Sequence, residues 1–206
     1  FEAEKEEDTE LSGYADTDLI KLNDGEVAKL ITGLEDGDPA THVATTGGEI
    51  SADAKHNGEY GLSVYYSDGS WGGFKNFSFD TTGISDWSKA KYIQFYVKNT
   101  CPETVGGNPT NPLEIFYFEI NNNPKCMLNY GAEGIKLYSI TTGKWSDIDV
   151  VENTFHLMPD ETKVPGIKIP AGFEGYVHIP LKALNFTQNL EEALPNVTGL
   201  SMYSLI

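Results

Sequence analysis

The stretch 92–98 reads Tyr-Ile-Gln-Phe-Tyr-Val-Lys. Successive side chains of a β-strand point to opposite faces of the sheet, so this alternation places Ile93, Phe95 and Val97 together on one face. Two tyrosines, Gln94 and a lysine then share the other face. The pattern predicts a β-strand that buries its apolar face and keeps a polar, aromatic face outside the core.

The same alternation recurs at residues 176–181, Tyr-Val-His-Ile-Pro-Leu, where three apolar side chains lie opposite Tyr176 and His178. Further segments rich in β-branched and aromatic residues are bounded by Gly, Pro and Asp-Gly turns, which is typical of short strands. Together the segments predict strands near 17–22, 28–34, 48–52, 60–67, 73–79, 91–98, 113–121, 125–130, 134–140, 145–151, 174–181 and 199–205.

Only residues 189–194 (Asn-Leu-Glu-Glu-Ala-Leu) have the pattern of a helical turn, which Pro195 ends. Many short strands with so little helix predict an all-β fold, an antiparallel β-sandwich of two sheets. Residues 1–13 are acidic and polar, and we expect them to be a flexible lead-in. No repeat or linker interrupts residues 14–206, which predicts a single domain there.

Fourteen basic and 31 acidic side chains give the chain a formal net charge of −17. Binding a nucleic-acid backbone needs clustered Lys and Arg, so nucleic acid is not an expected partner. The same charge disfavours an anionic membrane surface, and no apolar run approaches the roughly 18 residues of a membrane span. The composition suits a protein that meets a neutral ligand.

The residues that carry catalysis and metal binding are scattered. Cys101 and Cys126 are too few for a zinc site, and they form either one disulfide or two free thiols. A glycosidase needs two carboxylates facing one cleft. Glu114 and Glu119 are an odd number of residues apart, which predicts opposite faces. Asp147 and Asp149 share a strand face about 6.8 Å apart, which indicates a solvated or cation-binding pair. We therefore expect no catalytic activity.

The outer faces of the predicted strands carry tyrosines, amides and a histidine, where an ordinary solvated sheet has Lys, Glu and Thr. Aromatic faces cover the C–H patches of pyranose rings, and short polar side chains pair with sugar hydroxyls. This composition favours carbohydrate binding, although tyrosine also favours strands for its own sake.

Six stretches of the chain occur in a distinctive order: Leu30-Ile-Thr-Gly-Leu-Glu-Asp-Gly, Asn57-Gly-Glu-Tyr-Gly-Leu-Ser-Val-Tyr-Tyr, Asp68-Gly-Ser-Trp-Gly-Gly-Phe, residues 86–97 (Asp-Trp-Ser-Lys-Ala-Lys-Tyr-Ile-Gln-Phe-Tyr-Val), Tyr138-Ser-Ile and Gly175-Tyr-Val-His-Ile-Pro-Leu. In that order the chain resembles the jelly-roll carbohydrate-binding modules of bacterial plant-polysaccharide degradation, most closely those of family 11. The resemblance implies a jelly-roll sandwich that binds glucan without catalysis and often holds structural calcium. It also implies a secreted or cell-surface location within a larger multi-domain protein, and we expect a monomer.

The binding site predicted from the sequence centres on Trp71, whose neighbours Ser70, Gly72 and Gly73 leave room for a flat ligand. The resemblance matches Asp68 and a small polar residue, Asn76, of the same hairpin to cleft positions of the family. We expect the surface to be extended by residues that neighbouring strands place on one face, namely Tyr176, His178 and Tyr203.

The two other tryptophans differ in their expected exposure. Trp87 precedes a strand and is expected to plug the edge of the core, whereas burial and exposure are equally expected for Trp145. Glu35 and Asp36 offer hard oxygen ligands for calcium beside Gly37, or simply form an acidic turn.

The leading hypothesis is a non-catalytic module that binds a neutral plant glucan, either a β-1,4 or mixed-linkage glucan or starch. A catalytic β-sandwich glycosidase is the first alternative, and it requires a facing carboxylate pair. A protein-interaction module of a cell-surface assembly is the second alternative.

Overall fold

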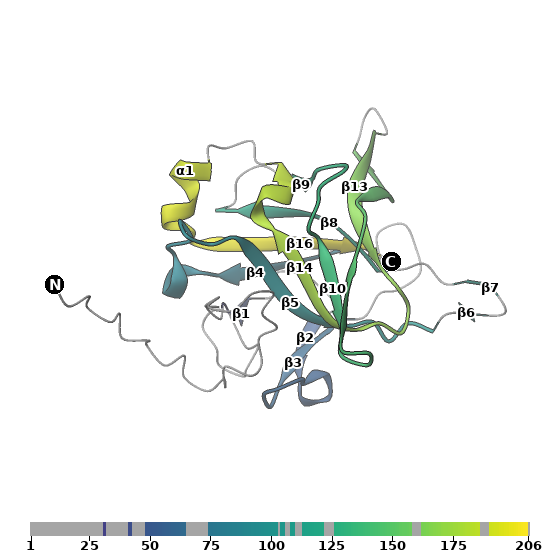
Figure 1. Cartoon of the computed structure of the whole chain (residues 1–206). Coiled ribbons are helices and arrows are strands. Elements are labelled where there is room, and N and C mark those ends of the chain that lie inside the picture. The colour runs from purple at the N-terminus through teal and green to yellow at the C-terminus, as the bar shows by residue number, and fades with distance from the viewer. Residues whose placement is uncertain are drawn as a thin grey trace.

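The computed structural model of the chain describes residues 31, 41–42, 48–64, 74–102, 104–105, 108–109, 113–121, 126–157, 162–185 and 190–205 (Figure 1). Within these ranges strands dominate and every strand pairing is antiparallel. The only α-helix of the described ranges, α1 (Leu190–Ala193), is a single turn. No helix within these ranges is long and apolar enough to cross a membrane. The predicted all-β antiparallel class is confirmed.

The larger sheet forms one layer of the fold. Its strand β8 pairs with β16 on one side and with both β13 and β9 on the other, and β15 continues from β9. In spatial order the main path is β1 (Thr41–His42), β4 (Phe74–Asp80), β16 (Gly199–Leu205), β8 (Leu113–Ile120), β13 (Thr162–Ile169) and β12 (Val151–Leu157), and the added strands are β9 (Cys126–Leu128) and β15 (Leu184–Asn185).

The smaller sheet has four strands, in the order β11-β10-β14-β5. Two hairpins, β2–β3 and β6–β7, stand apart from both sheets, and Figure 1 shows β2 and β3 below the lower ends of β5, β14 and β10. The bounds are β11 (Lys144–Asp147), β10 (Lys136–Ser139), β14 (Glu174–Pro180), β5 (Tyr92–Lys98), β2 (Gly48–Ser51), β3 (Gly61–Val64), β6 (Thr104–Val105) and β7 (Asn108–Pro109). Short 3-10 turns are η2 (Ala52–Ala54), η3 (Thr82–Ile84), η4 (Leu181–Ala183) and η5 (Leu194–Asn196).

The core lies where the two sheets face each other. Val177 and Ile179 of the small sheet are fully buried in one cluster with Phe118 and Ile167 of the large sheet. Leu181, which completes the apolar trio predicted in 176–181, is buried in the same cluster. Apolar burial from both layers is the main stabilising contribution of such a sandwich. The jelly-roll order of strands stays a prediction.

The predicted strands have counterparts wherever the structure describes them. Segments 17–22 and 28–34 lie outside the described residues, apart from Ile31, as does the lead-in 1–13. The segment 145–151 was extended too far, because β11 ends at Asp147 and the Ile148 N–H donates to the carbonyl of Ile135.

The sequence pattern does not predict β12 and β13. In β13, Pro165 and Gly166 interrupt the run of strand-forming residues. In the structure Pro165 pairs with Glu152 of β12, next to a register shift, and the ladder with β8 begins only at Ile167. A proline has no N–H to donate, so strands accept it where the ladder is irregular.

A bulge in β8 overturns the prediction for its two glutamates. The register against β16 shifts between Tyr203 and Ser204, and the core residues change parity from Leu113 and Ile115 to Phe118 and Ile120. One extra residue in a strand reverses the facing of everything after it. Glu114 and Glu119 therefore share the face that points away from the core.

Candidate functional site

Four aromatic residues lie in register across the small sheet. Tyr96 of β5 is opposite Tyr176 of β14, which is opposite Tyr138 of β10, which is opposite Trp145 of β11. Their strand neighbours Val177 and Leu137 are core residues, so alternation turns the four rings to the outer face. We call these four residues the aromatic row. Strands lie about 4.8 Å apart, so the row spans about 14 Å.

The rings of the aromatic row are inclined to one another. Tyr138 and Trp145 have ring centroids 5.2 Å apart with an interplanar angle of 63°, and Tyr96 and Tyr176 are 5.7 Å apart at 69°. Edge-to-face pairs of this kind are favourable, because the positive edge of one ring meets the negative face of the next. The row is therefore a stepped surface and not a single flat plane.

A second row on the same face consists of polar residues. Gln94, His178, Lys136 and Asp147 lie in register, each two residues along its strand from the member of the aromatic row. Lys136 forms an ion pair with Asp147, which neutralises both charges at the edge. His178 is 2% exposed, and its ring lies 4.0 Å from that of Tyr92 and 5.7 Å from that of Trp145.

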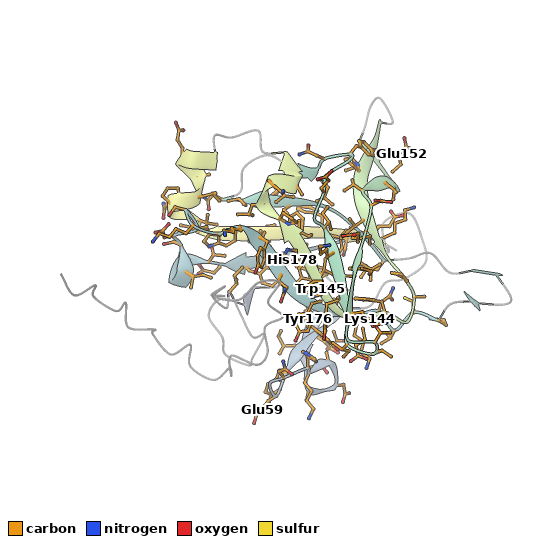
Figure 2. The ribbon with its side chains drawn as sticks, viewed as in Figure 1. Glu59, Lys144, Trp145, Glu152, Tyr176 and His178 are labelled. Carbon is orange, nitrogen blue, oxygen red and sulfur yellow. The ribbon has the colours of Figure 1, made fainter. Side chains whose placement is uncertain are left out.

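The rings of the aromatic row differ in exposure. Tyr176 is 7% exposed, whereas Tyr96, Tyr138 and Trp145 are partly exposed. Lys144 is exposed beside Trp145, and Figure 2 shows Trp145, Tyr176 and His178 together at the centre of the small sheet. Buried rings form the floor of the site, and Trp145 offers aromatic surface to a ligand.

An ion pair and a hydrogen bond hold the β5 end of the aromatic row. The Tyr96 hydroxyl donates to Glu174 over 2.7 Å, and Lys98 lies 3.2 Å from the other carboxylate oxygen. Burial, reinforced by Glu174, raises the pKa of Tyr96 well above its usual range. The hydrogen bond from Tyr96, helped by Lys98 and opposed by burial, lowers the pKa of Glu174. Tyr96 stays a neutral donor and Glu174 a charged acceptor.

Replacing Glu174 is expected to make the melting temperature less sensitive to acid pH. A carboxyl group whose pKa is lowered by folding stabilises the protein above its unfolded pKa of about 4.3, and this contribution disappears as the pH falls through the folded pKa. Between about pH 6 and about pH 3, the melting temperature of Glu174→Gln should therefore fall less than that of the wild type. Glu133→Gln, at an exposed residue, is the control and should follow the wild type. Identical acid sensitivity of all three proteins contradicts the assignment.

The structure separates the residues that the sequence grouped into one site. Asn76 and Tyr203 lie on adjacent strands as direct register partners, as expected for a shared surface. Tyr176 and His178 belong to the other sheet, so the prediction that all of them lie on neighbouring strands is wrong. The alternation of side chains predicts which face of its own strand each residue occupies, but it does not predict which sheet the strand joins.

The remaining predicted site residues lie outside the described residues. These are Trp71 and Asp68 of the hairpin, and Glu35 and Asp36 of the calcium proposal. On the strands near Asn76 and Tyr203, the hydroxyls of Ser78 and Ser201 are 2.8 Å apart and bond to each other. Tyr203 is partly exposed there.

Three members of the site were absent from the predicted set, namely Tyr96, Tyr138 and Trp145. Alternation in 92–98 does place Tyr96 outside the core, and Trp145 begins a strand after a turn. What the sequence lacks is the pairing of β10 with β14, which brings Tyr138 beside Tyr176.

The two glutamates of β8 are not spaced as a glycosidase pair. Glu114 and Glu119 share a face, but β16 aligns them with Leu205 and Ser201, which are four residues and hence about 13 Å apart. A retaining or inverting pair needs about 5–9.5 Å. Glu114 is moreover buried and paired with Lys168 over 3.1 Å.

Across the described ranges, no group of three or more His, Cys, Asp or Glu side chains is placed to hold a metal ion. The calcium expectation thus depends on residues outside those ranges. Cys101 carries a free thiol.

A shallow hollow of about 290 Å³ lies apart from the aromatic row, in the turn before β10. Tyr130, with 55% of its surface exposed, is the most exposed large hydrophobic side chain of the described residues and lines this hollow with Asn129, Glu133 and Lys182. Tyr130 is thus an exposed aromatic ring outside the aromatic row.

The fold and the site define an antiparallel β-protein with an aromatic, polar outer face on its smaller sheet. Comparison with known proteins finds no matching family model, no matching curated protein and no matching solved structure.

Proposed function

We propose that this protein binds a neutral glucan across the outer face of the small sheet, without catalysis. The observation that carries the proposal is the aromatic row, Tyr96–Tyr176–Tyr138–Trp145, held in register across four strands. Rings supply apolar surface for the C–H patches of sugars, and the adjacent, partly exposed Gln94 supplies polar groups for hydroxyls, while the buried His178 supports the rings from below.

The charges of the site also support a neutral ligand. Lys136 is paired with Asp147, and Lys98 with Glu174, so the ion pairs on this face are internally balanced. With a net charge of −17 on the whole chain, an anionic polymer is repelled and an uncharged one is not. In this proposal the module works in a secreted or cell-surface protein, where it holds attached domains on their polysaccharide. Calcium, if bound through Glu35 and Asp36, has a structural role.

Trp145→Ala is expected to weaken glucan binding about tenfold and to lower the melting temperature only modestly, because the ring is partly exposed although it packs on Tyr138. Loss of one exposed aromatic stack costs about 1–2 kcal/mol, by analogy with ring pairs and base stacking, and about 1.4 kcal/mol is a factor of ten. The measurement is affinity gel electrophoresis with starch, barley β-glucan, xyloglucan and xylan, beside a thermal melt of each variant. The gel that retards the wild type identifies the linkage.

Two control variants locate the site. Tyr130→Ala removes an exposed ring at the hollow and should bind as the wild type does. Trp71→Ala tests the platform predicted from the sequence. If Trp71→Ala releases the protein from the gel and Trp145→Ala does not, the site is on the predicted hairpin and the aromatic row is not the binding face. Retardation of the wild type in none of the gels favours the protein-interaction alternative.

A further inference from the structure

A histidine from outside the small sheet covers one end of the aromatic row. His56 lies in the segment that connects β2 to β3, and its imidazole is stacked on Tyr96 with ring centroids 3.7 Å apart and an interplanar angle of 6°. Its Nε2 atom is 2.9 Å from the hydroxyl of Tyr176. Figure 2 shows this segment, marked by Glu59, below Tyr176.

This arrangement matches what a bound sugar ring requires. A flat ring lies parallel to an aromatic face at stacking distance, and a polar atom bonds the neighbouring tyrosine hydroxyl. His56 thus occupies the ring face of Tyr96 and a hydroxyl of Tyr176 at the same time. The protein fills this position of the aromatic row with its own side chain.

The position of His56 is built into the segment that carries it. Ser51 caps the η2 turn by accepting a hydrogen bond from the Asp53 N–H over 3.2 Å. The backbone at Ala54 lies so close to the start of β3 that a Cβ on the buried Gly61 would be 2.1 Å from the Ala54 carbonyl oxygen. Only glycine permits this approach, so the turn before His56 is held against β3.

The two ends of the aromatic row therefore differ. At the β5 end, Tyr96 is covered by His56 and its hydroxyl is bonded to Glu174. Both β5 and β11 are edge strands of this sheet, but at the β11 end Trp145 is partly exposed and its neighbours Lys144 and Ser146 are exposed. A glucan bound along the aromatic row can therefore extend beyond Trp145, but His56 blocks its extension beyond Tyr96.

Resting on the proposed function, we infer that His56 is the end wall of the glucan site, so that the site takes the terminus of a glucan chain or a short oligosaccharide and not an internal stretch. The chain enters across β11 and stops at the imidazole. His56 acts here as a specificity-determining residue that sets how many sugar units fit.

The test is calorimetric titration with oligosaccharides of the preferred linkage, from disaccharide to hexasaccharide. For the wild type, affinity should rise with length and then stay constant once the row is filled. His56→Ala exposes the face of Tyr96, so the plateau should move to a longer oligosaccharide and the longest ligands should bind about tenfold tighter. His56→Phe keeps a ring over Tyr96 and should retain the wild-type plateau.

The outcomes separate the inference from the proposed function. An unchanged plateau in His56→Ala, or weaker binding at every length, overturns the end wall while glucan binding stands. A plateau that moves in His56→Phe as well also overturns it, and this variant preserves the packing if the alanine variant melts early. Absence of binding by the wild type at every length overturns the proposed function and the end wall with it.

Discussion

Trp87→Ala is expected to lower the free energy of unfolding by about 3–5 kcal/mol, the cost of emptying a buried aromatic site. Trp87 is 6% exposed and belongs to the cluster between the sheets. Its indole N–H donates to the carbonyl of Ile84 over 2.6 Å, and its backbone N–H donates to that of Leu194 over 2.7 Å. The loop before β5 is folded around this ring, so its removal affects packing and hydrogen bonding together.

Urea denaturation of Trp87→Ala and Trp145→Ala makes a matched comparison of two tryptophans. The first variant should lose several kcal/mol of stability, and the second should lose glucan affinity with a much smaller loss of stability. Trp87→Phe keeps most of the apolar volume but removes the donor to Ile84, so its stability should fall between wild type and alanine. Equal stability of wild type and Trp87→Ala contradicts the assignment of Trp87 to the core.

The behaviour of these tryptophans shows which parts of the fold the sequence predicts. Burial of Trp87 was expected from its place before a strand and is confirmed. Alternation along 92–98 and 176–181 gave the correct inward faces, because side-chain direction in a strand depends only on neighbours in the chain. Pairing between strands depends on residues far apart in sequence, and β13 is not predicted because Pro165 interrupts its local pattern.

The candidate site was less predictable than the fold for the same reason. Tyr96, Tyr138, Trp145 and Tyr176 come from four separate strands, and only their register makes them a row. His56 bonds to Tyr176 from 120 residues away along the chain. A single bulge in β8 was enough to reverse the expected relation of Glu114 and Glu119. Such features are set by tertiary packing, which local patterns do not contain.

Gly175→Ala is expected to destabilise the protein by about 3 kcal/mol or more, at the upper end of what overpacking costs. Gly175 lies in β14 between Val97 of β5 and Ser139 of β10. A Cβ there would lie 1.8 Å from the carbonyl oxygen of Tyr138 and 3.0 Å from the ring of Phe173. The nearest obstacle is backbone of the neighbouring strand, which cannot move away as a flexible side chain can.

The same substitution should also weaken glucan binding, because the strand forced away carries Tyr138 of the aromatic row. Gly83→Ala is the matched control, since no atom lies within 4 Å of the added Cβ, and its stability should stay within about 0.5 kcal/mol of the wild type. Urea denaturation followed by circular dichroism gives the free energies, and affinity gels at low temperature give binding by the folded fraction. If Gly175→Ala proves as stable as Gly83→Ala, β10 and β14 do not approach each other at this position, and the register that aligns Tyr138 with Tyr176 is wrong as well.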